Sequence, residues 1–171
     1  MPTTLRQATL EDAPLLSDLG VRTFREAFVE DFRVPYSASD LAAFLPAAYG
    51  VEALRRYLAD PAFVHFVAEA DGRAVGYALA GPNGLPHDEA SPADGELKRL
   101  YVVREAQGLG AGRLLLDAAL SWLGPRRIWI GVWSGNERAQ RVYEKRGFVK
   151  VGEYGFPVGE TLDREFILRR G

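Results

Sequence analysis

VREAQGLGAGRLLLDAAL, residues 103–120, carries three alternate glycines directly in front of an apolar run with helical spacing. Glycine allows the backbone to turn tightly and to present its N–H groups, and the first turn of a helix attracts anions. Gly108, Gly110 and Gly112 fit neither the Walker loop, which needs Lys and Ser/Thr after its last glycine, nor the dinucleotide loop, whose glycines are spaced differently. The stretch predicts either a loop that holds another phosphate-bearing ligand or a tight strand-to-helix turn without one.

The elements on either side of this loop predict one mixed α/β domain that covers residues 1–171. Strands are expected at residues 4–9, 96–103, 127–133, 148–154 and 163–170, with a hairpin at 63–81 around Asp71-Gly72. Helices are expected at residues 13–32, 39–58, 113–123 and 136–146, the second of them interrupted at Pro46 and Gly50. Residues 81–95, rich in proline, glycine and acids, predict a loop.

The composition excludes several kinds of site. The chain contains no cysteine, which rules out disulfides, cysteine nucleophiles and thiolate metal sites. Neither a secretory signal nor an apolar run of about 20 residues is present, so we expect a cytoplasmic protein with no membrane contact. His87 stands beside Asp88 and Glu89, but so small a cluster does not predict a metal site, and no metal is expected.

Charge is distributed unevenly along the chain. Residues 95–150 contain eleven Lys/Arg and five Asp/Glu, a balance of +6, whereas residues 11–60 contain five bases and nine acids, a balance of −4. A basic half around the glycine loop suits an anionic ligand and an acidic half suits a cationic one, although chance clustering of surface charges gives the same pattern. Because the basic surplus surrounds one loop and the net charge is −2, nucleic acid is not expected as a partner.

Two motifs give the loop a family context. Gln107-x-x-Gly110-x-Gly112 resembles the Q/R-x-x-G-x-G/A pyrophosphate loop of the GNAT superfamily of N-acyltransferases, and NERAQRVYEKRGF, residues 136–148, is similar to the second signature of that superfamily. The two motifs occur in the superfamily's order, separated by one helix and one strand. The resemblance implies acetyl-CoA as cosubstrate and the GNAT fold, an α/β architecture with a mostly antiparallel sheet of about seven strands. It also implies helices on both faces and a splay between the fourth and fifth strands.

The resemblance also implies which residues contact the cosubstrate. Leu100 N–H is expected to donate to the acetyl oxygen, an interaction worth about 2.7–4 kcal/mol, and the loop and helix start are expected to hold the pyrophosphate. Asn136 is expected to bond the pantetheine arm, with helix capping as its alternative or additional role. The residues implied in binding are Leu100, Val102, Val103, Gln107, Gly108, Leu109, Gly110, Ala111, Gly112, Arg113, Asn136, Ala139 and Tyr143.

Acetyl transfer needs a base, because an alkylamine with a pKa near 10.4 is only about one part in a thousand neutral at pH 7. Glu96 opens the fourth predicted strand at the spacing of the glutamate that some members of the superfamily use as base; an exposed strand-start glutamate is the alternative. Tyr143 matches the tyrosine that protonates the departing thiolate, and a core tyrosine is the alternative. Such a positioned acid or base contributes about 10²–10⁴-fold.

The acceptor site of the superfamily is formed by its first two helices and the loop before the fourth strand. Glu26, Glu30 and Asp31 are therefore expected to line it and to attract a cationic amine. Residues 23–60 and the ending 151–168 also resemble the bacterial PaiA-type polyamine N-acetyltransferases, although Asp163-Arg164-Glu165 stands where those proteins usually have Gln-Thr-Asp.

Three functions remain open on this interpretation. The first is acetyl transfer in a ternary complex to a small, polyamine-like amine, and the second is acetylation of a protein N-terminus or lysine, which needs a wide groove. The third is a domain that binds acetyl-CoA as a sensor without turnover. The exposed edge of a final strand is a common pairing surface, so the chain is also a candidate homodimer.

Overall fold

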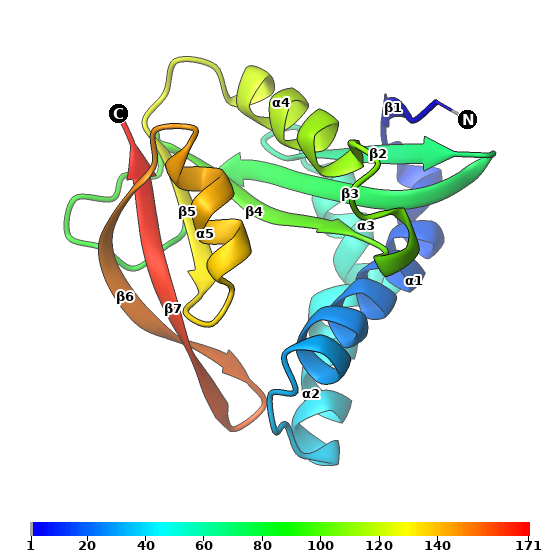
Figure 1. The fold of residues 1–171 in the computed structure, drawn as a ribbon, viewed down its shortest axis with the longest axis horizontal. Coiled ribbons are helices and arrows are strands. Elements are labelled where there is room, and N and C mark those ends of the chain that lie inside the picture. Colours follow the sequence, from blue (N-terminus) through cyan, green and yellow to red (C-terminus); the bar gives the residue numbers. More distant parts are fainter. Residues whose placement is uncertain (1) are drawn as a thin grey trace.

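One sheet of seven strands runs through the part of the chain that the computed structural model describes, residues 2–171. Its strands are β1 (Thr4–Gln7), β2 (Val64–Ala70), β3 (Arg73–Pro82), β4 (Gly95–Val102), β5 (Ile128–Trp133), β6 (Val149–Val158) and β7 (Thr161–Arg170). They lie in the order β1-β2-β3-β4-β5-β7-β6, and each neighbouring pair is antiparallel except β4 and β5, which are parallel. The predicted mixed α/β sheet and its order of elements are confirmed (Figure 1).

The parallel pair of strands separates after a short contact. Residues 95–97 of β4 pair with residues 128–130 of β5, and beyond that point β4 continues to Val102 and β5 to Trp133 without pairing to each other. Figure 1 shows the two strands diverging from this contact. The divergence is the expected splay, and beyond it β4 and β5 no longer bond to each other.

Helices cover both faces of the sheet (Figure 1). One face carries α1 (Ala13–Phe24), the π-helical turn η2 (Arg25–Asp31), α2 (Ala38–Tyr49) and α3 (Val51–Ala59). The other face carries α4 (Ala111–Leu123) and α5 (Glu137–Glu144), and the 3₁₀ turns η1 (Leu10–Asp12) and η3 (Arg104–Ala106) complete the fold. Arg146, just past α5, forms an ion pair with Asp117 of α4 at 2.6 Å. Among the described residues, no helix combines the length and the hydropathy needed to cross a bilayer.

Two sequence-based expectations need correction. Helix α2 continues through Pro46 and stops only at Gly50, because Pro46 stands in the last turn, where the missing N–H costs a single helical hydrogen bond. The final strand β7 does not form the exposed edge of the sheet. It pairs with β5 on one side and with β6 on the other, so β6 is the edge at this end.

The tip of the β6–β7 hairpin is fastened to the start of α2. Asp40 accepts hydrogen bonds from Glu160 N–H at 2.8 Å and from Thr161 Oγ1 at 2.7 Å, and Asp40 N–H donates to Ser37 Oγ at 3.0 Å. The hydrogen bonds that the Asp40 carboxylate accepts, first that from Thr161 and then that from Glu160 N–H, lower the pKa of Asp40 to about 2. The attachment brings β7 side chains opposite those of α1 and α2, so that a cavity forms between distant parts of the chain.

Candidate active site

The glycine loop joins β4 to α4. Gly108 and Gly110 have left-handed backbone angles, with φ of +83° and +92°, and open space surrounds the position of an added Cβ. Gly112 lies in the first turn of α4, where an added Cβ would meet Val102 Cγ2 at an ordinary 3.8 Å. No side chain caps the start of α4 at Ala111. The N–H groups of the first turn are therefore available to an anion at the positive end of the helix.

The backbone of β4 divides its hydrogen bonds between two sides. Val103 N–H donates to Val75 O at 2.8 Å, so alternate residues of β4 bond to β3, and Leu100 and Val102 direct their backbone groups into the gap beside β5. Gln107 Nε2 donates to Val102 O at 3.1 Å and so links the glycine loop to this strand. Leu100 and Val102 thus face the gap, whereas the N–H of Val103 is already bonded within the sheet.

Asn136 and Tyr143 lie at opposite ends of α5. The Asn136 side-chain oxygen accepts a hydrogen bond from Ala139 N–H at 3.1 Å and caps the helix, which leaves its amide nitrogen free to donate. Tyr143 is buried beside Phe148, and its hydroxyl has no hydrogen-bond partner in the described part of the chain. Burial raises the pKa of Tyr143 well above its usual value, so the phenol keeps its proton at neutral pH.

A β-bulge turns charged side chains of β4 toward one face of the sheet. The pairing of β4 with β3 shifts by one residue at Lys98. Because of this shift, Glu96 and Lys98 line the same cavity as Arg99 and Tyr101, although strict alternation would send these two pairs to opposite faces. The cavity lies on the face that carries α1 to α3.

This cavity has a volume of about 190 Å³, and its walls are mainly aromatic. It opens where the two central strands diverge, because Tyr101 of β4 and Gly131 of β5 both line it. We call it the aromatic pocket. Its lining residues are Phe24, Phe28, Phe44, Tyr49, Tyr57, Leu85, Glu96, Lys98, Arg99, Tyr101, Gly131, Tyr154, Phe156, Asp163 and Glu165.

Three carboxylates stand in the aromatic pocket, and two of them have strong fixed partners. Glu96 is buried, forms an ion pair with Lys98 at 2.8 Å and accepts a hydrogen bond from Gly84 N–H at 2.8 Å. Asp163 accepts a short hydrogen bond from the hydroxyl of Tyr36, and burial raises the pKa of Asp163. Both side chains are thereby held in place.

Glu165 is the third carboxylate. A Cβ on Gly131 would stand 3.1 Å from Glu165 Oε1, so the missing side chain on β5 makes room for this carboxylate. Tyr154 Oη donates to Glu165 Oε1 at a long 3.3 Å. Burial, together with the nearby carboxylates of Asp163 and Glu96, raises the pKa of Glu165 to about 7. Glu165 therefore changes its charge near neutral pH.

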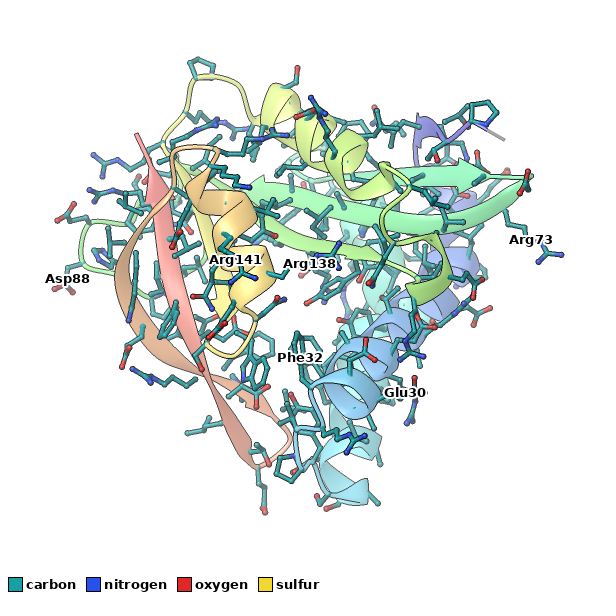
Figure 2. The ribbon with its side chains drawn as sticks, viewed as in Figure 1. Glu30, Phe32, Arg73, Asp88, Arg138 and Arg141 are labelled. Atoms are coloured by element: carbon teal, nitrogen blue, oxygen red, sulfur yellow. The ribbon has the colours of Figure 1, made fainter. Side chains whose placement is uncertain are left out.

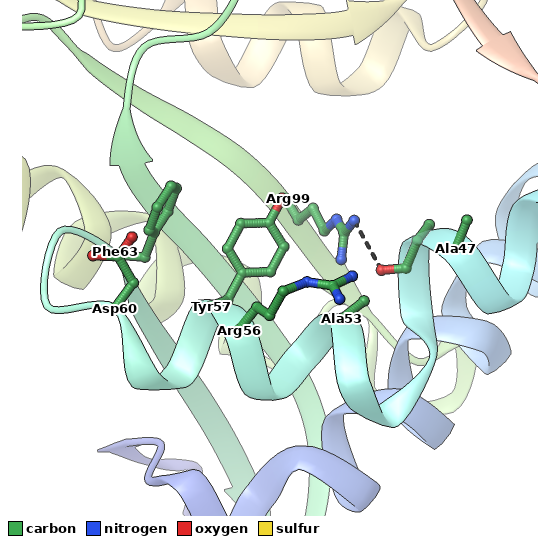
Figure 3. Close-up of a pocket in the computed structure, with 8 residues that line it drawn as sticks. Ala47, Ala53, Arg56, Tyr57, Asp60, Phe63 and Arg99 are labelled. Atoms are coloured by element: carbon green, nitrogen blue, oxygen red, sulfur yellow. Dashed lines mark hydrogen bonds between the residues drawn. The ribbon is translucent and has the colours of Figure 1, made fainter.

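A second cavity of about 250 Å³ adjoins the aromatic pocket (Figure 3). Its lining residues are Ala47, Ala48, Ala53, Arg56, Tyr57, Asp60, Phe63 and Arg99. Tyr57 and Arg99 line both cavities and thus form the wall between them. We call this second cavity the arginine pocket.

The sequence profile of the Acetyltransferase (GNAT) family matches residues 21–148. The chain belongs to the GNAT family. An uncharacterized N-acetyltransferase of Mycobacterium bovis is 33% identical over 94% of this chain and 98% of its own, and one of Lactobacillus delbrueckii subsp. lactis is 28% identical over 85% and 86%. The solved PaiA N-acetyltransferase of Thermoplasma acidophilum in complex with coenzyme A is similar with a TM-score of 0.76 at 19% identity, covering 99% of each chain.

GNAT membership makes the protein an acetyl-CoA-dependent N-acetyltransferase and confirms the predicted fold. The loop, the gap beside β4 and the start of α5 are the places where the family resemblance predicts cosubstrate contacts. Leu109 and Arg113 are exposed beside the start of α4, and Ala111 is buried beneath it. Arg113 thus presents a free surface cation next to the uncapped N–H groups.

The acids of η2 lie outside the GNAT aromatic pocket. Arg104 Nη2 contacts Glu30 at 2.7 Å and Asp31 at 2.8 Å, and Arg104 N–H donates to Glu26 at 2.9 Å. Figure 2 shows Glu30 on the outer side of its helix. The three acids expected to form the substrate wall are thus absent from the lining of the aromatic pocket and contact Arg104, and the acids inside the cavity come from β4 and β7.

Sequence reasoning missed Glu165 and Arg99. Glu165 shares one face of β7 with Asp163 and with the buried Ile167 between them and Arg169, and two acids at this spacing on a core strand were a usable sign of buried carboxylates. Arg99 stands inside the predicted strand 96–103, where a charge also conflicts with burial. The face of the sheet on which the Arg99 side chain lies depends on the β-bulge at Lys98. No local pattern in the sequence reveals this bulge.

Proposed function

We propose that this GNAT enzyme acetylates the primary amine of a small molecule bound in the aromatic pocket. The observation that carries the proposal is that this pocket opens at the gap between β4 and β5, where the backbone groups of Leu100 and Val102 face away from β3. Tyr101 and Gly131 stand at this boundary. A donor held along β4 would therefore meet an acceptor held in the pocket.

The donor side supplies binding and charge stabilisation. Acetyl-CoA brings an activated thioester carbonyl when it is bound. The N–H groups at the start of α4, together with Arg113, would hold its pyrophosphate, because a helix start and a cation both stabilise phosphate. Leu100 N–H would donate to the carbonyl oxygen as that oxygen gains charge, a contribution of about 2.7–4 kcal/mol. Asn136 would bond the pantetheine arm, and the small Ala139 would leave room for it.

Glu165 is placed to take the proton from the acceptor's ammonium group. With a pKa of about 7 it exchanges a proton near neutral pH, as an efficient general base must. Glu96 is the base expected from its sequence position, but Lys98 Nζ and Gly84 N–H already contact its Oε1. We assign the proton transfer to Glu165 and an electrostatic role toward the ammonium group to Glu96.

Tyr143 would protonate the thiolate of coenzyme A as the thioester bond breaks. Its raised pKa keeps the phenol protonated, and its hydroxyl is not committed to another group of the described chain. The same burial that raises the pKa of the phenol would disfavour a free thiolate next to it, because a low-polarity environment disfavours both anions. Proton delivery therefore remains feasible in this position.

The size of the aromatic pocket favours a small acceptor over a protein. A cavity of about 190 Å³ holds a short amine, whereas a protein acetyltransferase needs a groove that admits extended chain. A polyamine is a second candidate acceptor, supported by the carboxylates of Glu96, Asp163 and Glu165, which would attract a second ammonium group.

Thiol release from acetyl-CoA tests the proposal with a panel of polyamines, aminoglycosides, amino acids and peptides. We expect turnover with at least one small amine, and turnover with spermidine or spermine would support the polyamine candidate. A peptide that is acetylated faster than every small amine would favour protein acetylation instead. Binding of acetyl-CoA without thiol release for any acceptor would favour the sensor alternative.

A further inference from the structure

Arg99 carries a positive charge into the wall of the site, and no carboxylate of residues 2–171 pairs with it. Its Nη2 donates to Ala48 O at 3.2 Å, and its guanidinium lies 4.5 Å from the ring centre of Tyr49 and 5.8 Å from that of Tyr57. Its Nη1 is enclosed and has no hydrogen-bond partner among the described residues. Because a guanidinium stays charged and an enclosed donor is costly to leave unbonded, this group requires an acceptor.

The charged residues around Arg99 have hydrogen-bond or ion-pair partners of their own. Lys98, the preceding residue, pairs with Glu96 at 2.8 Å. Asp163 and Glu165 line the same aromatic pocket, yet their hydrogen bonds go to tyrosine hydroxyls. The pocket thus contains acids that leave Arg99 unpaired, which indicates that a ligand supplies the negative charge.

The position of Arg99 joins the two cavities. With Tyr57 it lines both the aromatic pocket and the arginine pocket. Figure 3 shows the guanidinium groups of Arg99 and Arg56 directed toward the same part of the arginine pocket, beside Ala53. The lining of this pocket contains these two arginines and one acid, Asp60. A ligand that extends from the aromatic pocket past Arg99 therefore enters a region of net positive charge.

We propose that Arg99 binds a carboxylate group of the acceptor, so that the substrate is a small molecule with a primary amine at one end and a carboxylate at the other. The proposal rests on the proposed function and names the class of its substrate. The ammonium end would lie toward Glu165 and Asp163, and the carboxylate end toward Arg99. Since Arg99 directly precedes Leu100, an acceptor anchored here lies beside the strand segment proposed to hold the acetyl group.

The local charge balance favours a carboxylate over other groups. The planar fork of a guanidinium matches the two oxygens of a carboxylate, and a single enclosed cation balances a single negative charge. A phosphate dianion would bring excess negative charge toward Asp60. A second ammonium group, as in a polyamine, would place like charges together at Arg99.

The test compares primary amines of equal chain length that end in a carboxylate, a phosphate, a hydroxyl or a second ammonium group. We expect kcat/KM from thiol release to be about 10–100-fold higher for the carboxylate than for the hydroxyl, the range expected for a charge-assisted hydrogen bond. A hydroxyl, ammonium or phosphate acceptor that equals or exceeds the carboxylate would overturn the proposal and leave the acetyltransferase function standing. Absence of thiol release with every amine would overturn the proposed function as well.

Arg99→Gln separates recognition from a general effect on the enzyme. This variant is expected to remove most of the carboxylate preference, mainly by raising KM for the acceptor, with KM for acetyl-CoA unchanged. Arg55→Gln is the matched control, because Arg55 is an exposed arginine of α3 paired with Glu52 and lies outside both cavities. A folded Arg99→Gln enzyme that keeps the full preference would overturn the proposal. If this variant does not fold, the acceptor series on the natural enzyme decides the question.

Discussion

Residues 100–113 and 136–143 supply the whole proposed donor side, whereas the aromatic pocket draws on side chains between Phe24 and Glu165. The donor side works largely through backbone groups, namely the free edge of β4, the glycine loop and the start of α4. The acceptor side works through side chains, several of them charged and buried. The two sides meet where β4 and β5 separate.

This difference has a physical origin. Backbone N–H groups are present in every sequence, so a donor site needs only glycines and a helix start to expose them. A pocket that selects an acceptor needs particular side chains, and their positions follow from packing between distant segments. We therefore expect donor variants to affect every acceptor alike and pocket variants to distinguish among acceptors.

The largest expected effect is that of Tyr143→Phe on the donor side. Loss of the proton donor should lower kcat by about 10²–10⁴-fold for every acceptor, with little change in KM. Tyr77→Phe is the matched control, because Tyr77 is also buried with an unpartnered hydroxyl but lies outside the aromatic pocket. Steady-state kinetics with two acceptors would test this, and a Tyr143→Phe enzyme with natural kcat would remove Tyr143 from the chemistry.

Glu165→Gln should give the next largest loss of activity, and it should also change how the rate depends on pH. Because the carboxylate must be ionised to act as base, the rate should rise through its pKa of about 7 and level off above, apart from the titration of the amine itself. The variant should lose this rise, together with about 10²-fold in kcat/KM at pH 8, the lower end of the range for a general base. Glu153→Gln, on the edge strand β6, is the control and should keep the profile.

Ionisation of Glu165 should raise the reaction rate but lower the stability of the folded protein. Because the folded state raises the pKa of Glu165 above its usual value, ionisation disfavours the folded state. The free energy of unfolding should therefore fall as the pH rises from about 4.5 through 7, and Glu165→Gln should lessen this fall. Urea unfolding at several pH values measures it, and an unchanged pH dependence in the variant would contradict the assignment.

Gly110→Ala should have an intermediate effect that is confined to the donor side. With φ of +92° at this position, an alanine costs about 1–2 kcal/mol of unfolding free energy, and a relaxed loop should weaken coenzyme A binding by about tenfold. Gly124→Ala is the control, because Gly124 also has a positive φ, +70°, but ends α4 far from the loop. Gly124→Ala should lose the more stability in urea, because its backbone angles (φ +70°, ψ −149°) are almost exclusive to glycine. Equal losses of coenzyme A affinity in the two variants would contradict a specific role for the loop.

The smallest effect is expected for the double variant Glu30→Gln/Asp31→Asn. These exposed acids pair with Arg104, and such surface ion pairs contribute at most about 1 kcal/mol to stability. Acceptor KM should change by less than about threefold, since neither residue lines the aromatic pocket. A tenfold rise in acceptor KM would restore the sequence-based hypothesis that these acids form the substrate wall.

Local sequence was sufficient where a residue's role depends on its immediate neighbours. The Asp71-Gly72 hairpin turn, the loop before α4 and the cap at Asn136 follow from conformational preferences over a few residues, and the structure contains each of them. Glu26 shows where this reasoning stops. The sequence indicated that Glu26 lies on a helix. Which face of that helix meets the cavity depends on how η2 packs against β4, and the sequence does not show this.

The sequence by itself determined the mixed sheet, the order of its elements and the family, because periodicity and short motifs report local conformation. Only the tertiary structure decided which charges meet. The β-bulge at Lys98 turns Arg99 toward the cavities, and the hairpin held by Asp40 brings Glu165 across from Glu96. In the proposed enzyme the loop 103–110 would hold the donor through its own backbone, whereas the acceptor would be selected by contacts between strands and helices that lie far apart in the chain.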